Sequence, residues 1–379
     1  MIDALRNSYE IEFFRARYNA FYLFSILASE PVRKRRLDEQ GVNEEEYKAI
    51  KKEEEAKTAE YLVSKNKKET KKQQDPFGSQ KIIECISRGD VFINNDRNSE
   101  EAKAKLRYQL MKYVALIRHP GLVTPTNDER SMQIAFTARY SSGCISRQVG
   151  AVVVGQEGYI RGMGWNDPPE GFIPCLYRTH KELIVCGDKN LFSNYERNIH
   201  FIKRIKEEKQ KNPALLDNAP FCFKDYQKNI EFDEFLENIE KDKKENIKKH
   251  KDKILKFYKN PSRERALHAE ENAFLQITKV GGEPVVGGTL YSTAFPCQLC
   301  AKKSMQLKIK RIVYIDPYPD IALTHTFGTY GEEVEPPKLE MFSGAIGPAY
   351  FKLFAPFLPV KDELKILLEE GEEGKSNGG

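Results

Sequence analysis

Hydrophobic and polar residues follow helix-like spacing in the first third of the chain. Apolar and aromatic residues recur at three- and four-residue steps from Arg6 to Ser29, which predicts one aromatic-rich helix with a broad buried stripe. A second helical region is predicted from Ile82 to about Ile117, where His119-Pro120-Gly121 ends it. Residues 124–129 then offer N-cap candidates for a third helix.

The second half of the chain combines strand-like and helix-like patterns. Helices are predicted to start near Leu267 and at Pro296. The predicted strands are Val149–Val154, Tyr159–Met163, Thr289–Thr293 and Arg311–Ile315. The resulting order α-β-β-α-β-α-β predicts an α/β, three-layer α-β-α domain with a mixed sheet.

Charged segments divide these patterned regions. A Lys/Glu run over residues 41–72 indicates either a solvated helix with i,i+4 pairs or an interaction arm. Residues of about 187–261 form a charge-dense insertion whose apolar residues are spaced for helices, and the Glu/Gly-rich tail, 369–379, is expected to be disordered. We therefore expect a helical N-terminal region at 1–120, a domain with a helical insertion at 121–350, and a C-terminal segment at 351–379.

Composition and charge exclude several classes of protein. The 379 residues include 61 Lys+Arg and 56 Asp+Glu, so the net charge is +5, and this mild balance does not predict nucleic-acid binding. No apolar run approaches the length of a membrane span, and residues 1–6 lack a signal-peptide pattern. We expect a cytoplasmic protein with no membrane partner. In that reducing compartment, the seven cysteines favour metal binding or chemistry over a disulfide framework.

Two short motifs carry the candidate chemistry. The sequence H-A-E at residues 268–270 is predicted to open one helix, and P-C-Q-L-C at residues 296–300 to open another. Cys297 and Cys300 are three residues apart, so on a helix their sulfurs point to one side and can bind one tetrahedral ion. The helix N-terminus favours their thiolate forms, and His268 would supply a third ligand.

Three protein ligands leave one position for water, as in catalytic rather than structural zinc sites. Zinc lowers the pKa of such a water towards about 7. Glu270 lies two residues past the His268 ligand and is turned differently on the helix, so it suits a proton shuttle rather than a fourth ligand. A C-x-x-C pair alone is often structural, but the combination of H-x-E with P-C-x-x-C is the signature of zinc nucleobase deaminases.

Further segments extend the match. Residues 144–153 are similar to the segment before and within the first strand of the deoxycytidylate (dCMP) deaminase branch, and residues 289–296 to its T-L-Y-x-T-x-x-P strand. Residues 164–169 are similar to its G-[YW]-N-G-x-P loop, with Asp167 where Gly is usual. From about residue 127 to 318, without the insertion, the chain thus resembles the cytidine/deoxycytidylate deaminase superfamily. The resemblance implies a cytidine-deaminase-like fold with an N-terminal helical extension and a helical insertion.

The resemblance also implies roles for the motif residues. His268, Cys297 and Cys300 would hold the zinc cofactor. Glu270 would pass protons between water, the ring N3 and the leaving amine.

Substrate contacts are implied at three further positions. Asn166 would hydrogen-bond the sugar or base, and the backbone at Ala269 would read the pyrimidine edge. Arg147 is the candidate for a 5′-phosphate contact, with an ordinary surface arginine as the alternative. Because Asp167 departs from the family pattern, the resemblance does not carry an effector site over to that loop.

A second, structural zinc is a further expectation from the resemblance. Some dCMP deaminases use one Cys before the first strand and another after the G-[YW]-N loop, and Cys144 and Cys175 occupy those positions. Side chains that could complete the site are Cys186, Cys222, His180 and His250. The alternative is that these cysteines are buried and unpaired.

Residues 2–10 resemble a segment of the N-terminal P-loop-type domain of bacterial antiphage dCTP/dCMP deaminases. The nucleotide-binding part of that domain precedes this segment, and the present chain starts inside it. We therefore expect a remnant of a P-loop-type domain and no NTP binding by it.

These observations lead to one expected function and two alternatives. The expected function is zinc-dependent deamination of dCTP or dCMP to the deoxyuridine nucleotide and ammonia, in antiphage defence by nucleotide depletion, by a homo-oligomer. The first alternative is a deaminase acting on tRNA or single-stranded nucleic acid, for which the Lys-rich residues 241–253 are the candidate groove. The second is a non-enzymatic, zinc-stabilised interaction module. The sequence identifies no regulatory RNA or protein partner.

Overall fold

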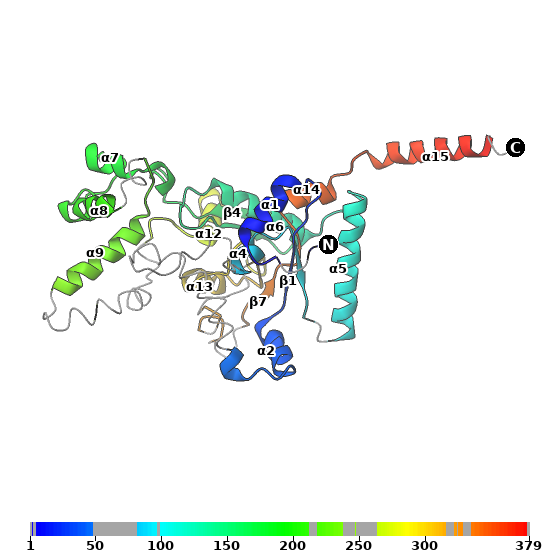
Figure 1. Cartoon of the computed structure of the whole chain (residues 1–379), viewed down its shortest axis with the longest axis horizontal. Helices are drawn as coiled ribbons and strands as arrows, with labels where there is room; N and C mark the ends of the chain where they lie inside the picture. Colours follow the sequence, from blue (N-terminus) through cyan, green and yellow to red (C-terminus); the bar gives the residue numbers. More distant parts are fainter. Residues whose placement is uncertain are drawn as a thin grey trace. The chain divides into compact units, whose positions relative to one another are not determined.

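The structure is a computed structural model of the whole chain. It describes residues 2, 5–47, 82–96, 99–211, 218–237, 247, 264–315, 322–323, 325–328 and 335–376. The chain divides into two compact units, Met1–Ile134 with Lys310–Gly379, and Ala135–Ile309 (Figure 1). The boundaries of these units differ from the domain boundaries expected from the sequence. The expected domain boundaries stay predictions.

The first unit contains a small mixed sheet in the order β1-β2-β8. Strand β1 is parallel to β2, with Phe24 opposite Val91, and β8 is antiparallel to β2. Strand β6 is parallel to β7, with Arg311 opposite Lys338. The elements of this unit are α1 (Ser8–Arg17), β1 (Phe24–Leu27), α2 (Glu30–Asp38), α4 (Ile82–Ser87), β2 (Val91–Asn94), α5 (Glu100–Arg118), α6 (Asn127–Ala138, across the division), β6 (Arg311–Tyr314), β7 (Lys338–Met341), β8 (Gly344–Ala345), α14 (Pro348–Phe354) and α15 (Val360–Ser376).

The single N-terminal helix expected from residue 6 to 29 is wrong. Helix α1 begins after Asn7, whose side chain accepts a hydrogen bond from the Tyr9 N–H at 2.8 Å, and it ends at Arg17. Residues 24–27 instead form β1, because pairing with the distant strand β2 decides between helix and strand for a short aromatic run. The expected buried stripe is also wrong: Ile11 is fully buried, but Phe13 is 51% exposed.

The helical region expected from residue 82 to 117 is interrupted by a strand. Val91, Phe92 and Ile93 are all fully buried in β2, which a solvent-facing helix turn could not achieve. The Asp90 carboxylate accepts a hydrogen bond from the Leu23 N–H at 2.8 Å just before the two strands pair. A non-local contact thus sets the start of β2.

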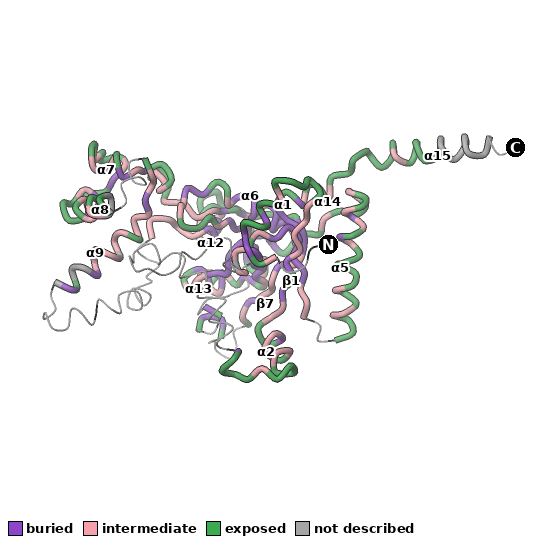
Figure 2. Tube along the Cα trace, in the orientation of Figure 1, coloured by how far each residue is buried: buried purple, intermediate pink, exposed green. Residues whose placement is uncertain are grey.

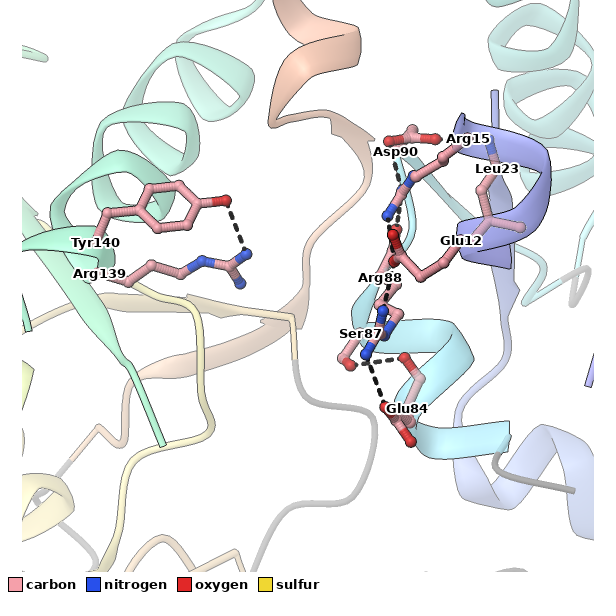
Figure 3. Close-up of polar contacts among 9 residues, drawn as sticks. All are labelled: Glu12, Arg15, Leu23, Glu84, Ser87, Arg88, Asp90, Arg139 and Tyr140. Atoms are coloured by element: carbon pink, nitrogen blue, oxygen red, sulfur yellow. Dashed lines mark hydrogen bonds and ion pairs between the residues drawn. The ribbon is translucent and has the colours of Figure 1, made fainter. Parts of the chain in front are cut away.

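Charged side chains join α1, α4 and the start of β2 (Figure 3). Arg15 donates to the buried Asp90 carboxylate at 2.8 Å, and Arg88 donates to Glu84 at 2.8 Å and to Glu12. Burial raises the pKa of Asp90, and the ion pair with Arg15 opposes this shift in part. This network holds α1 against α4 and the start of β2.

In the second unit, strand β3 is antiparallel to both of its neighbours, β4 and β5. Strand β3 is buried along its whole length. In contrast, most positions of the labelled helix α5 in the first unit are exposed or partly buried (Figure 2). The strands expected at residues 149–154, 159–163 and 289–293 are confirmed, as are the helices expected to start near Leu267 and at Pro296. The elements are β3 (Gly150–Val154), β4 (Ile160–Trp165), α7 (His180–Val185), α8 (Ile199–Lys211), α9 (Phe223–Glu237), α12 (Ala269–Val280), β5 (Thr289–Ser292) and α13 (Gln298–Gln306), with short 3-10 turns at Arg139–Ser141 and Cys175–Tyr177.

Helix α12 packs closely on β4 because β4 carries glycines on the facing side (Figure 1). A Cβ atom at Gly164 would lie 2.4 Å from both the Ala269 carbonyl oxygen and the Ala273 nitrogen. The Asn272 side chain also donates to the Trp165 carbonyl at 2.7 Å. These contacts hold the N-terminus of α12 at the end of β4.

The insertion forms helices around its own aromatic cluster, as predicted for α8 and α9. Leu183, Phe192, Phe201, Ile205, Phe221 and Ile230 form its buried core. Arg178 is fully buried there, paired with Glu196, and its guanidinium lies over the Phe192 ring at 4.9 Å. Of the apolar residues used for the helix prediction, Ile239, Ile254, Leu255 and Tyr258 lie outside the described residues.

The observed combination of helices with parallel and antiparallel strands confirms the mixed α/β class. The expectation of a disordered tail is wrong up to Ser376, because α15 runs through it, beginning with Asp362 and Glu363 in its first turn, where acidic residues favour a helix. Residues 377–379 lie outside the described chain. In the residues that are described, no helix combines the length and the apolar character that crossing a membrane requires.

Candidate metal and active site

The three predicted metal ligands lie at the starts of two helices. His268 is the N-cap of α12, with φ −77° and ψ 155°. Cys297 is the N-cap of α13, one residue before the helix rather than inside its first turn, and Cys300 follows in that turn. The two helices are joined by an ion pair between Lys303 of α13 and Glu271 of α12.

The structure brings these three side chains together. The Nδ1 atom of His268 lies 3.2 Å from the Cys297 Sγ and 3.5 Å from the Cys300 Sγ. Tetrahedral zinc with ordinary Zn–S and Zn–N bonds separates nitrogen from sulfur by roughly 3.6 Å. The donor set and its spacing therefore fit a zinc ion. Among the described residues, this is the one group of three such side chains close enough to share a metal.

The close contact of the three ligand side chains shifts the pKa of each of them. A hydrogen bond with Cys300, followed by one with His268, lowers the pKa of Cys297 to about 4, against the opposing effect of burial. Hydrogen bonds with Cys297 and then Glu264 raise the pKa of His268 to about 10. The pKa of Cys300 is raised because its thiol shares a proton with the Cys297 thiolate and is buried. A bound divalent ion would displace that shared proton and the imidazole proton.

Glu270 lies on α12 and is buried, with only 3% of its surface exposed. Ser292 of β5 donates a hydrogen bond to its Oε1 atom at 3.3 Å. Burial raises the pKa of Glu270 above the ordinary range, while the backbone and the His268 charge oppose the shift. A carboxyl group with a raised pKa next to a metal site is suited to accept and return a proton.

The predicted substrate-contact residues differ in their burial and in their hydrogen bonds. The Asn166 amide bridges the chain before β3: its Oδ1 accepts from the Val149 N–H at 2.7 Å, and its Nδ2 donates to the Arg147 carbonyl at 2.7 Å. The side chain of Arg147 is exposed, and Ala269 is fully buried against β4. The roles of these residues in substrate binding stay predictions.

The residues considered for a second zinc do not form a metal-binding group in the described part of the chain. Cys144 and Cys175 lie on adjacent segments, since the Leu176 N–H donates to the Gly143 carbonyl at 3.0 Å. Both ring nitrogens of His180 are engaged, by the Ala219 carbonyl and the Tyr226 hydroxyl, each at 2.8 Å. Burial raises the pKa of Cys222 to about 11. His250 is outside the described residues, and the second zinc stays a prediction.

Sequence reasoning missed the polar residues that support the ligands. Glu271 accepts from the His268 backbone N–H at 3.4 Å, and its place three residues into the helix is a detectable capping signal. Glu264 contacts His268, and Lys224 contacts Glu264. Glu264 and Lys224 are 40 residues apart and meet only in the folded chain. No spacing rule could have paired them.

Comparisons with known proteins agree with the motif. Residues 238–316 match the sequence model of the cytidine and deoxycytidylate deaminase zinc-binding region. The deoxycytidylate deaminase of Enterobacteria phage T2 is 27% identical over 190 residues, which is 49% of this chain and 78% of that protein. The phage T4 deoxycytidylate deaminase is 26% identical over 191 residues, 49% of this chain and 76% of that protein.

Two other similarities are a short sequence match and a structural alignment. ComE operon protein 2 of Bacillus subtilis is 43% identical over 54 residues, 14% of this chain and 28% of that protein. The dCMP deaminase of the cyanophage S-TIM5, solved as a crystal structure, aligns with a TM-score of 0.29 and 20% identity over 58% of this chain and 100% of that one. The part of the chain that carries His268, Cys297 and Cys300 is therefore similar to the zinc-binding region of cytidine and deoxycytidylate deaminases.

Proposed function

We propose that the protein is a zinc-dependent hydrolase that deaminates a deoxycytidine nucleotide, dCMP or dCTP, to the deoxyuridine nucleotide and ammonia. The observation that carries the proposal is the position of the His268 Nδ1 atom, 3.2 and 3.5 Å from two thiol sulfurs, with the buried Glu270 two residues further on the same helix. The two phage relatives named deoxycytidylate deaminases support this substrate class.

The chain supplies a proton path for this reaction. Bound zinc would act as a Lewis acid and acidify a water molecule. Glu270 takes a proton from the attacking water, delivers it to N3 of the cytosine ring, and then assists proton transfer to the amine as the C4–N bond breaks. Ser292 keeps the carboxyl of Glu270 in place through the hydrogen bond to Oε1. Burial of this side chain excludes bulk water from the proton path.

Three residues complete the proposed substrate site. The Ala269 backbone reads the pyrimidine edge, because it lies between the ligand His268 and the proton carrier Glu270. Asn166 holds the loop of residues 147–149 and contacts the sugar or base. Arg147, whose side chain is exposed at that loop, contacts the 5′-phosphate.

A substrate panel tests the reaction. Ammonia release is measured from dC, dCMP, dCTP, CMP, CTP, single-stranded DNA and tRNA with the zinc-loaded protein. We expect turnover of dCMP or dCTP and a loss of at least about 100-fold in the Glu270→Gln variant, because a positioned acid–base group contributes that much. Zinc content in the variant should equal that of the parent. Parent-level turnover in Glu270→Gln would refute the proton-carrier role.

Other outcomes of the panel support the alternatives. Turnover of tRNA or single-stranded DNA alone, with salt-sensitive binding, would identify a polynucleotide deaminase. Absence of ammonia release from every substrate, with zinc bound, would identify an interaction module instead.

The biological setting and the assembly are further parts of the proposal. Depletion of the deoxycytidine nucleotide pool would limit phage replication, which is the role suggested by the resemblance of residues 2–10 to antiphage deaminases. Measuring dCTP in infected cells that carry the parent or the Glu270→Gln variant tests it: only the parent should lower the pool. The predicted homo-oligomer is tested by light scattering of the purified protein.

A further inference from the structure

A carboxylate lies on the side of His268 that faces away from the two sulfurs. The Oε2 atom of Glu264 is 3.6 Å from the His268 Nε2 atom, within ion-pair distance. The Nδ1 atom of the same ring is the one close to Cys297 and Cys300. The imidazole therefore lies between a metal-ligand pair and a carboxylate.

The two ring nitrogens cannot play the same role when a metal is bound. A neutral imidazole that binds a metal through Nδ1 carries its proton on Nε2, so Nε2 becomes a hydrogen-bond donor. Metal-binding histidines usually donate that hydrogen to a carboxylate or carbonyl, which sets the ring orientation and makes the ligand more basic. Glu264 is the acceptor that the structure places next to Nε2.

Glu264 is itself held by a residue of the insertion. Lys224, the second residue of α9, donates to the Oε1 atom of Glu264 at 2.8 Å. Oε1 is thus occupied by the lysine, while Oε2 points to the imidazole. The side chains of Glu264 and Lys224 are 32% and 37% exposed, so water screens this pair only in part.

We propose that Glu264 is a positioning residue for the ligand His268, and that Lys224 extends this support into the insertion helix α9. The proposal rests on the proposed zinc site. Glu264 fixes the ring so that Nδ1 faces the two sulfurs, and Lys224 selects the rotamer of Glu264 that leaves Oε2 free for Nε2–H. The insertion, which supplies none of the three ligands, thereby contributes to metal affinity.

Zinc affinity measured by competition with a chromogenic chelator tests the proposal. We expect the Glu264→Ala variant to bind zinc about 10- to 100-fold more weakly than the parent, the usual effect of removing such a partner. Glu264→Gln keeps an acceptor oxygen but no charge, so its affinity should lie between the two. Lys224→Met should weaken binding several-fold, and by much less when Glu264 is already Ala, because the lysine acts through the glutamate.

A second measurement separates ligand positioning from general stability. The visible spectrum of the cobalt(II)-substituted protein reports ligand geometry, and it should change in Glu264→Ala but not in Lys279→Met. Lys279 is the matched control, because it lies on α12 and forms a 2.7 Å ion pair with Glu170. If Glu264→Ala lowers the melting temperature of the metal-free protein, the comparison is made with Glu264→Gln.

The outcomes distinguish this inference from the proposed function. A parent protein that binds no zinc would overturn both. Zinc binding by the parent with affinities and cobalt spectra unchanged in Glu264→Ala and Glu264→Gln would overturn the inference alone. Equal losses from Lys224→Met in the presence and absence of the glutamate would overturn the role of α9.

Discussion

At the scale of single residues, burial and direct contact decide what each candidate group can do. Cys297 and Cys144 are both partly buried cysteines, but only Cys297 has an imidazole and a second thiol beside it, and its pKa is lowered to about 4. The contact with Cys300 and His268, rather than exposure, therefore makes Cys297 a candidate ligand.

The two cysteines should differ when each is replaced. Cys297→Ser removes one of three ligands, so we expect loss of bound zinc and of turnover. Cys144→Ser, the matched control, should keep turnover and lose at most the zinc of the predicted second site. Zinc is measured by atomic emission after dialysis. Full zinc content in Cys297→Ser would contradict the proposed ligand set.

The hydrogen bond from Ser292 to Glu270 is a second residue-scale prediction. Ser292→Ala removes the donor and leaves the buried carboxyl with one contact less. We expect kcat to fall about 3- to 10-fold with little change in zinc content, since one ordinary hydrogen bond contributes roughly 0.5–1.5 kcal/mol. An unchanged kcat at saturating dCMP or dCTP would show that Ser292 does not support the carboxyl during turnover.

At the scale of secondary-structure elements, the approach of α12 to β4 positions the catalytic motif. The helix begins directly after His268 and includes Glu270, so a displacement of its N-terminus moves both residues. Gly164 permits the close approach, because any side chain there would overlap the helix backbone.

Replacing Gly164 tests this packing. Gly164→Ala should lower the free energy of unfolding by about 1–3 kcal/mol, the usual cost of an extra methyl group in a packed site. It should also reduce turnover, because the helix must shift. Met163→Ala, next to it on the same strand but 41% exposed, should cost less than about 1 kcal/mol. Equal stability of the two variants in urea unfolding would show that the contact is not tight.

At the scale of the whole molecule, buried ionic groups make stability depend on pH. Glu129 is 1% exposed and accepts hydrogen bonds from Lys112 at 2.8 Å and from the Tyr113 hydroxyl at 2.6 Å. Burial alone would raise the pKa of Glu129, but the bonds from Lys112, Tyr113 and Thr126 outweigh it and leave the pKa lowered. The ionised form thus stabilises the fold.

The sign of the pH effect follows from this lowered pKa. The contribution of Glu129 is fully present above the pKa of about 4.5 of an unfolded chain, and it is lost as pH falls through the lower pKa of the folded state. In Glu129→Gln we expect lower stability at pH 7, by about 3 kcal/mol, and a smaller further loss between pH 5 and 3. The melting temperatures of the parent and of Glu129→Gln, measured from pH 3 to pH 7, test this prediction. Glu100→Gln, in an exposed ion pair, is the control and should follow the parent curve.

Local patterns allowed much of the second unit to be predicted. The apolar run at residues 150–154 and the strand at 289–292 appear as expected, because such short β-branched or alternating runs between turns have few other ways to be buried. The metal-binding group followed from the spacing of its motifs. The capping role of Glu271 was also visible in principle, since it depends on residues three apart.

Contacts between residues distant in sequence explain what could not be predicted. The apolar residues of β1 fit both the helix and the strand period, and only the pairing of β1 with β2 decides between them. Glu264 meets Lys224 across 40 residues, and the Asn166 amide binds the backbone of residues 147 and 149. These contacts have no local signal.

The amino-acid sequence alone establishes the donor types and their spacing: one imidazole, two thiols three residues apart, and a carboxylate two residues beyond the imidazole. These are local features of covalent order and helix geometry, which hold wherever the helices lie. Three features follow only from the folded chain. The Nδ1 atom of His268 faces the sulfurs, the buried Glu270 accepts a hydrogen bond from Ser292, and a lysine of the insertion donates to Glu264. The physical reason is that burial and hydrogen-bond partners depend on chain segments brought together from far apart, and the packing of the whole fold determines which segments meet.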